Sequence, residues 1–267
     1  VPTTRALAAV TTGQTVLRNG PERGAVLARV AASHLRVGTF QYFAARGQTE
    51  QVRQLADYAI QRHYPDLVVS PAPYLDLFRR VRDRQAHLVA QWMLLGFVHG
   101  VLNTDNVTIS GQGIDYGPCA FMDRYDPATV FSSIDRNGRY AYGNQPNIAQ
   151  WNLARFAESL LDLIDPEDSD AAIAKATEAL NQFPQHYQAA WLKGVRAKLG
   201  LMKDLPGDLD LANDLLALMA ESRADFTQTF RSLSDVVRGS EAAFRDRFLD
   251  LAAIDPWLGR YGERTTR

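Results

Sequence analysis

One polar stretch of the sequence decides how the rest is interpreted: HGVLNTDNVTISGQGIDYG, residues 99–117. It begins at His99, reaches Asn106 seven residues later, and ends in Asp115-Tyr116-Gly117 after a short Val-Thr-Ile run and a glycine-rich turn. Asn, Asp and Gly also populate turns for local reasons, and that is the simplest alternative for any one of these residues. The whole ordered set predicts a shaped loop that carries chemistry.

This order resembles the catalytic loop of protein kinases, in which H-R-D-x-x-x-x-N precedes D-F-G. One position departs from the kinase pattern. Two residues after His99, where kinases carry the proton-accepting aspartate, the chain has Val101, whose side chain cannot accept a proton. Asp105 restores a carboxylate directly before Asn106, so we expect an altered arrangement of base and nucleotide. His99 itself is expected to hold backbone by hydrogen bonds.

The geometry of a metal ion explains why these residue types belong together. A Mg²⁺ ion that bridges phosphates keeps several waters and takes one or two hard oxygen ligands from protein. The amide oxygen of Asn106 and the carboxylate of Asp115 would supply them if residues 107–110 and 113–115 pair as two short strands. The pattern therefore predicts a Mg²⁺ site, with Mn²⁺ as an alternative ion, beneath a nucleotide cleft.

The regions around this loop predict two kinds of secondary structure. Apolar runs at residues 6–10 and 15–17 flank Thr11-Thr12-Gly13, which favours a hairpin turn there, and a third run follows at 25–30. Apolar residues then recur at helical spacing over residues 49–63 and 74–97.

Helical periodicity resumes at Asn147 and continues to the end, with Asp170 as a candidate N-cap. We expect an α+β, mostly α fold of the protein-kinase type, represented mainly by its helical C-lobe. Residues 1–46 would be a β-rich remnant of the N-lobe, and residues 47–267 the helical lobe with its catalytic loop at 99–118.

Three sequence blocks together resemble one family, the selenoprotein O family of pseudokinase-like protein adenylyltransferases. The first block is the loop itself, followed by FMD at residues 121–123 and YDP at 125–127. The others are RVAASHLRVGTF at 29–40, and GRYAYGNQP at 138–146 running into WNLAR at 151–155. The resemblance is strong over about residues 1–165 and weak over the helical remainder.

The resemblance implies transfer of AMP from ATP to Ser, Thr or Tyr hydroxyls of proteins, with ATP bound in the reverse sense to a kinase. By position, Asp105 would be the proton acceptor, Asn106 and Asp115 the Mg²⁺ ligands, and Arg29 and Arg36 the contacts to the nucleotide phosphates. Guanidinium groups suit that last role because they bind phosphate oxygens bidentately and stay charged. Two alternatives remain: a kinase-like phosphotransferase using the same metal pair, and an inactive pseudokinase scaffold that binds nucleotide.

The resemblance also implies segments that are absent here. The family carries a glycine-rich loop and a phosphate-binding lysine upstream, whereas no lysine precedes Lys175 in this chain, and family members continue past the equivalent of Arg267. We therefore expect an internal portion of a longer protein, with weak or no activity on its own.

Composition excludes several other classes of protein. Lys and Arg number 29 against 30 Asp and Glu, and a net charge of −1 argues against a broadly cationic nucleic-acid binder. The longest apolar run, residues 92–98, is far shorter than a membrane span. Cys119 is the only cysteine, which excludes an internal disulfide and fits a reducing compartment. We expect partners limited to ATP and protein substrates, in the bacterial cytoplasm or, for a eukaryotic protein, the mitochondrion.

Overall fold

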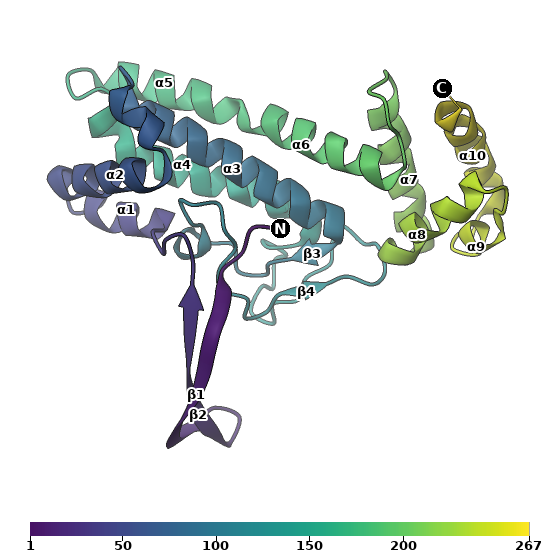
Figure 1. The fold of residues 1–267 in the computed structure, drawn as a ribbon, viewed down its shortest axis with the longest axis horizontal. Helices are drawn as coiled ribbons and strands as arrows, with labels where there is room; N and C mark the ends of the chain where they lie inside the picture. Colours follow the sequence, from purple (N-terminus) through teal and green to yellow (C-terminus); the bar gives the residue numbers. More distant parts are fainter. Residues whose placement is uncertain (267) are drawn as a thin grey trace.

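The computed structural model describes residues 1–266, and its fold is α+β with helices predominating (Figure 1). The strands are β1 (Arg5–Leu17), β2 (Pro21–Val30), β3 (Phe97–Val98) and β4 (Ala120–Phe121). The α-helices are α1 (Val37–Ala44), α2 (Thr49–His63), α3 (Pro73–Leu95), α4 (Gln145–Ile164), α5 (Ser169–Asn181), α6 (Phe183–Lys198), α7 (Asp208–Ser222), α8 (Phe226–Val237), α9 (Ala242–Arg245) and α10 (Leu251–Thr265). Short 3-10 helices lie at η1 (Pro65–Val69), η2 (Thr104–Asn106) and η3 (Tyr142–Asn144).

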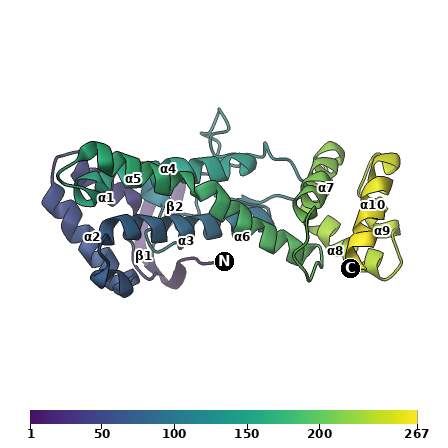
Figure 2. The same cartoon turned by 90° about the horizontal axis from the view of Figure 1, so that it is seen from above.

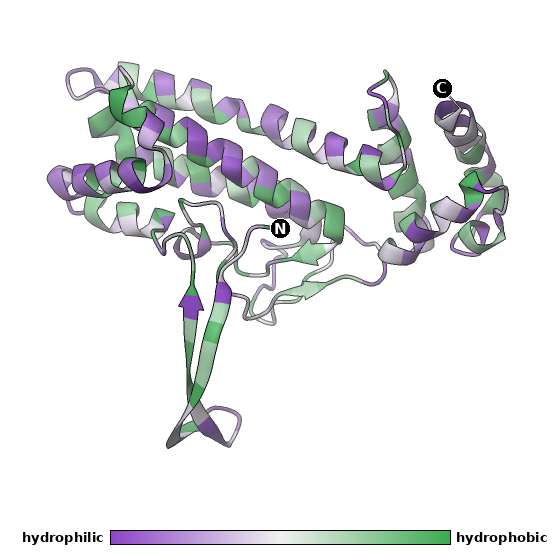
Figure 3. Cartoon of the chain, viewed as in Figure 1, coloured by the Kyte–Doolittle hydropathy of each residue, from purple (hydrophilic) through white to green (hydrophobic). Residues whose placement is uncertain are grey.

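The two long strands form an antiparallel hairpin that projects away from the helices (Figure 1). The predicted turn at Thr11-Thr12-Gly13 is wrong. Residues 5–17 form one strand that pairs with β2, and the register merely shifts between Thr11 and Thr15. The chain reverses instead at residues 18–20, where Arg18 N–H donates to the carbonyl of Gly20. Both strands carry hydrophobic residues, which are the green segments of the hairpin in Figure 3. Several of these side chains are exposed, for example Leu7 (74%) and Leu17 (83%).

The two long helices predicted before the polar loop are confirmed. The sequence prediction of 49–63 coincides with α2, and that of 74–97 corresponds to α3, which ends two residues earlier. Gly96 ends α3 because its backbone takes a φ of +69°, and its N–H donates back to the carbonyls of Met93 and Trp92. A Cβ at Gly96 would lie 3.0 Å from the Phe226 ring, so the close packing of α8 also favours glycine there.

Helix α3 is the centre of the helical body, because it packs against α4, α5 and α6 (Figure 2). Three buried aromatic rings join the layers: Phe156 of α4 meets Phe40 of α1 edge-on at 5.1 Å and Phe78 of α3 at 6.1 Å. Burial of such large rings supplies much of the hydrophobic free energy that holds these helices together. These helices therefore share one hydrophobic core with the residues that precede and follow the polar loop.

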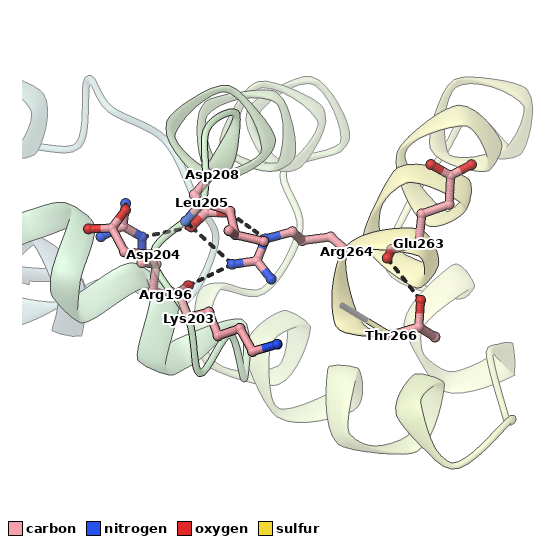
Figure 4. Close-up of polar contacts among 8 residues, drawn as sticks. All are labelled: Arg196, Lys203, Asp204, Leu205, Asp208, Glu263, Arg264 and Thr266. Atoms are coloured by element: carbon pink, nitrogen blue, oxygen red, sulfur yellow. Dashed lines mark hydrogen bonds and ion pairs between the residues drawn. The ribbon is translucent and has the colours of Figure 1, made fainter.

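The C-terminal part is helical, as predicted, but one predicted cap is wrong. Asp168, not Asp170, caps α5, since its carboxylate accepts a hydrogen bond from the Ala171 N–H. Further along, the buried carboxylate of Asp208 on α7 joins Arg196 of α6 to Arg264 of α10 (Figure 4). Among residues 1–266, no helix is both long and apolar enough to cross a lipid bilayer.

Candidate active site

The loop between α3 and β4 does not form the predicted hairpin. Residues 107–110 and 113–115 do not pair with each other, because the N-terminal part of the chain takes their backbone partners. Val37 N–H donates to the Val107 carbonyl at 2.9 Å, and Ile109 N–H donates to the Leu35 carbonyl at 2.9 Å.

The backbone of Gly113, on the other side of the glycine-rich turn, also pairs with residues near the N-terminus. Gly113 exchanges hydrogen bonds with Pro2 and Thr4, and forms a parallel bridge with Thr3. The Thr108 hydroxyl then closes the glycine-rich turn, donating to the Gln112 carbonyl at 2.7 Å and accepting from the Gln112 N–H at 3.0 Å. Backbone hydrogen bonds therefore hold together three segments of the site: residues 2–4, 35–37 and 107–113.

Asp105 and Asn106 lie side by side on η2. The side-chain N–H of Asn106 donates to the Val101 carbonyl at 2.9 Å, which fixes the amide and leaves its Oδ1 as an open acceptor. The Asp105 side chain is exposed, and within residues 1–266 its carboxylate accepts no hydrogen bond and forms no ion pair. An open amide oxygen and a free carboxylate thus lie on consecutive residues.

The N-terminal end of α1 packs against η2. Arg36 Nη1 donates to the main-chain oxygen of Asp105 at 3.1 Å. A Cβ at Gly38 would lie 3.3 Å from both the Cα and the N of Asp105, so the close approach favours glycine. The structure therefore brings Arg36, predicted as a phosphate contact, directly to Asp105, predicted as the base.

His99 connects this half of the site to the Asp115 half. Its Nε2 donates to the Ile114 carbonyl at 2.8 Å, and its Nδ1 accepts a long hydrogen bond, 3.4 Å, from the Val101 N–H. A carbonyl only accepts and a backbone N–H only donates, so the ring is neutral with its proton on Nε2. Burial lowers the pKa of His99, opposed by the Ile114 hydrogen bond and the charge of Asp115, which agrees with a neutral ring. The expected backbone-holding role of His99 is confirmed.

Asp115 follows Ile114 in a left-handed backbone conformation, with φ at +62°. Non-glycine residues rarely adopt this region, although Asp and Asn do so more readily than most. The side chain is exposed, and its carboxylate makes no hydrogen bond or ion pair within the described residues. Such local strain is typical of functional sites, where surrounding structure holds a residue in an uncommon backbone conformation.

Tyr116 anchors Asp115 from the other side. Its ring packs near Phe97 and His99, with centroids 6.1 Å away in both cases, and its hydroxyl hydrogen-bonds to the Thr3 hydroxyl. A Cβ at Gly113 would fall 2.2 Å from the Tyr116 hydroxyl oxygen, so Gly113 leaves the space that this anchor fills. Neither Tyr116 nor Thr3 could be given this role from the sequence, because their contact joins residues 113 positions apart.

Arg29 is the penultimate residue of β2, and its side chain is exposed. Burial raises the pKa of the Tyr116 phenol, and the charge of Arg29 acts weakly in the opposite direction. The Arg29 guanidinium has no hydrogen bond or ion pair within residues 1–266. Arg36 therefore lies at the Asp105 half of the site, and both predicted phosphate-binding arginines keep free N–H donors within the described residues.

The oxygen atoms of these side chains suit a hard divalent cation, and the arginine N–H groups suit a polyphosphate. It combines one open amide oxygen, two unpartnered carboxylates and two arginines that keep free N–H groups. Within the described residues, no three His, Cys, Asp or Glu side chains cluster as a metal cage. A sparse pair of protein ligands is what Mg²⁺ commonly uses when phosphates and waters complete its shell.

Comparison with known proteins adds an independent line of evidence. Residues 1–261 match the sequence model of a family described as "Protein adenylyltransferase SelO". The chain is 57% identical over 269 residues to a protein nucleotidyltransferase YdiU of Rhizobium leguminosarum bv. trifolii, covering 100% of this chain and 54% of the relative. It is 59% identical over 265 residues to a protein nucleotidyltransferase YdiU of Cereibacter sphaeroides, covering 99% of this chain and 55% of the relative. The chain spans about half the length of the curated relatives it matches.

Proposed function

The chain belongs to the SelO family of protein adenylyltransferases, and on that basis we propose that the protein transfers AMP from ATP to Ser, Thr or Tyr hydroxyls of other proteins. The relatives named above are protein nucleotidyltransferases, which agrees with this class of reaction. The proposal includes a protein-kinase-like architecture for the whole enzyme, a location in the cytoplasm, and partners limited to ATP and protein substrates.

One observation carries the proposal. Asp105 is the only carboxylate between His99 and Asn106, it has no partner within the described residues, and it stands next to the amide oxygen that Asn106 presents. Val101 occupies the position at which a kinase would carry its base. A catalytic carboxylate displaced in this way supports a reaction at a phosphorus atom other than the terminal one.

The chain's own residues would divide the chemistry as follows. Asp105 accepts the proton of the acceptor hydroxyl while that oxygen forms a bond to the α-phosphorus of ATP. The bond from the α-phosphorus to the oxygen that bridges it to the β-phosphorus breaks, and pyrophosphate leaves. Arg29 and Arg36 hold the phosphate oxygens by charge-assisted hydrogen bonds. Asn106 and Asp115 would hold Mg²⁺, or Mn²⁺, which when bound neutralises phosphate charge.

Mass spectrometry of the modified substrate separates the three candidate functions. The full-length protein is incubated with ATP, Mg²⁺ and a bacterial protein extract, and modified peptides are identified. AMP on Ser, Thr or Tyr is the expected result. Phosphate on the same residues would support a phosphotransferase and refute the proposal, and ATP binding with no modification would support a nucleotide-binding scaffold.

A further inference from the structure

Two buried amide side chains of α4 face the loop that carries Asp105 and Asn106. Gln145, in the first turn of α4, is 1% exposed, and Asn152 is 0% exposed. They are seven residues apart, which puts them on one face of the helix two turns from each other. Neither residue belongs to the set of side chains assigned above to ATP, metal or the acceptor hydroxyl.

Gln145 holds the beginning of the loop with both of its polar atoms. Its Oε1 accepts a hydrogen bond from the His99 N–H at 2.9 Å, and its Nε2 donates to the Phe97 carbonyl at 2.9 Å. One amide therefore fixes the backbone on either side of Val98, where the short strand β3 gives way to irregular structure.

Asn152 holds the next point along the same backbone. Its Nδ2 donates to the Leu102 carbonyl at 3.0 Å and to the Ile148 carbonyl of its own helix at 2.8 Å. Its Oδ1 is buried and has no hydrogen-bond partner within residues 1–266. An orphaned buried oxygen costs stability, so an asparagine at this position is not explained by packing alone.

The hydrogen bonds that orient the predicted metal ligands come from His99 and Val101, which lie in the segment that Gln145 and Asn152 hold. The Val101 carbonyl orients the Asn106 amide, and the His99 ring holds the Ile114 carbonyl next to Asp115. Any shift of the backbone over residues 97–102 would therefore move both predicted metal ligands together.

We propose that Gln145 and Asn152 are positioning residues, which fix residues 97–102 on α4 so that Asp105, Asn106 and Asp115 stand in register for transfer. The reaction they serve is the one proposed above, and this inference rests on it. Because misplacement of reacting groups by about 1 Å can reduce a rate by about 100-fold, the effect should be large although neither residue touches substrate.

Two variants remove these contacts while keeping side-chain volume. Gln145→Met loses both hydrogen bonds to the loop. Asn152→Leu loses the bond to Leu102 and also removes the orphaned oxygen, which limits the loss of stability. Ser159→Ala is the matched control, because Ser159 is a buried polar residue of the same helix whose hydroxyl donates only to the Phe156 carbonyl at 2.6 Å.

The experiment measures two quantities on the full-length protein. Hydrogen–deuterium exchange of peptides covering residues 97–106 should accelerate by about tenfold or more in both variants, with exchange over the rest of α4 unchanged. The rate of AMP transfer at saturating Mg²⁺ and ATP should fall by about 10- to 100-fold, with the Kd for ATP changed by less than about threefold. Ser159→Ala should leave both quantities as in the wild type.

Wild-type exchange and wild-type transfer rates in both variants would overturn the proposal. So would faster exchange spread evenly over the helical body, because that pattern indicates general destabilisation. Exchange also separates the two proposals: if the wild-type protein moves no AMP but the variants still expose residues 97–106, the proposed function fails, whereas the anchoring of residues 97–102 on α4 stands.

Discussion

The Nε2 atom of His99 donates a hydrogen bond to the main-chain oxygen of Ile114 over 2.8 Å, and the next residue is Asp115. This single contact joins the segment that carries Asp105 and Asn106 to the segment that carries the second predicted metal ligand. Because the ring is buried and neutral, the link needs no charged partner and is insulated from solvent. It explains how an irregular loop keeps two halves of a site at a fixed separation.

Replacing His99 by leucine should break that link. His99→Leu leaves the Ile114 carbonyl and the Val101 N–H without their partner, which should cost about 1–3 kcal/mol of unfolding free energy. It should also reduce AMP transfer by at least about tenfold, because Asp115 loses its support. Denaturant unfolding and a transfer assay check the two effects. His87→Leu, on the exposed face of α3 with Gln91 as its partner, is the control and should change neither quantity appreciably.

The same histidine predicts a pH dependence of stability. Its folded pKa is lowered from the ordinary value of 6.5, so the unfolded chain takes up a proton first as the pH falls. The stabilising contribution is fully present above pH 6.5 and is lost as the pH falls through the lower folded pKa. Burial also lowers the pKa of His63, assisted by Arg84 and Arg62, and acts in the same direction.

Thermal midpoints measured from pH 8 downward test this expectation. The wild type should lose stability below pH 6.5, and His99→Leu should lose less over the same range, with the remainder due to His63. Identical pH profiles for the two proteins would show that His99 is protonated equally easily in the folded and unfolded states.

Secondary structure near the site could be predicted from local pattern, whereas its long-range pairing could not. The 3.6-residue period of apolar residues located α2 and α3, because each helix buries one continuous face. Val107 and Ile109 alternate as a strand would, but their partners are residues 35–37, and nothing local in the sequence identifies so distant a partner. Thr11-Thr12-Gly13 likewise carries turn residues that the structure uses for a register shift within β1.

In the candidate site too, the residues could be predicted from the sequence, whereas the long-range contacts that hold them could not. Asp105, Asn106 and Asp115 could be singled out because they recur in a known order, and the arginines because they sit in a matching block. The contacts that hold them, such as Arg36 to Asp105 and Tyr116 to Thr3, join residues 69 and 113 positions apart. The convergence of Asn106 and Asp115 on one metal ion stays a prediction, as does the domain boundary after residue 46.

Asp208 should be the most important charged residue for the stability of the C-terminal helices. Its side chain is 1% exposed and accepts hydrogen bonds from Arg264 Nε at 2.6 Å and Arg196 Nε at 2.8 Å (Figure 4). Asp208→Asn leaves Arg264 without its charge partner and Arg196 with only the exposed Asp204, and should cost about 3–5 kcal/mol. Asp204→Asn, which removes a 78% exposed partner of Arg196, should cost under about 1 kcal/mol. Equal losses in the two variants, measured by denaturant unfolding, would contradict this ranking.

Asp105→Asn should separate chemistry from binding. The amide keeps the shape of the side chain but cannot act as a general base, so the transfer rate should fall by about 100- to 10,000-fold. The Kd for ATP should change by less than about threefold, since a base acts chiefly in the transition state. Asp66→Asn is the control and should transfer AMP at the wild-type rate. Asp66 lies on η1, where it is an exposed ion-pair partner of Arg80 on α3. A large rise in the Kd with an unchanged rate would instead make Asp105 a nucleotide contact.

The most direct test of AMP transfer follows the two ends of the triphosphate separately. The full-length wild-type protein and Asp115→Asn are each incubated with Mg²⁺ and ATP labelled at the α- or the γ-phosphate, and label on protein is counted. Asparagine tolerates the left-handed backbone at this position, so the substitution removes the charge without adding strain. The wild type should incorporate α-label and no γ-label, and Asp115→Asn should lose nearly all incorporation. Incorporation of γ-label by the wild type, or undiminished α-label incorporation by Asp115→Asn, would contradict adenylyl transfer at this site.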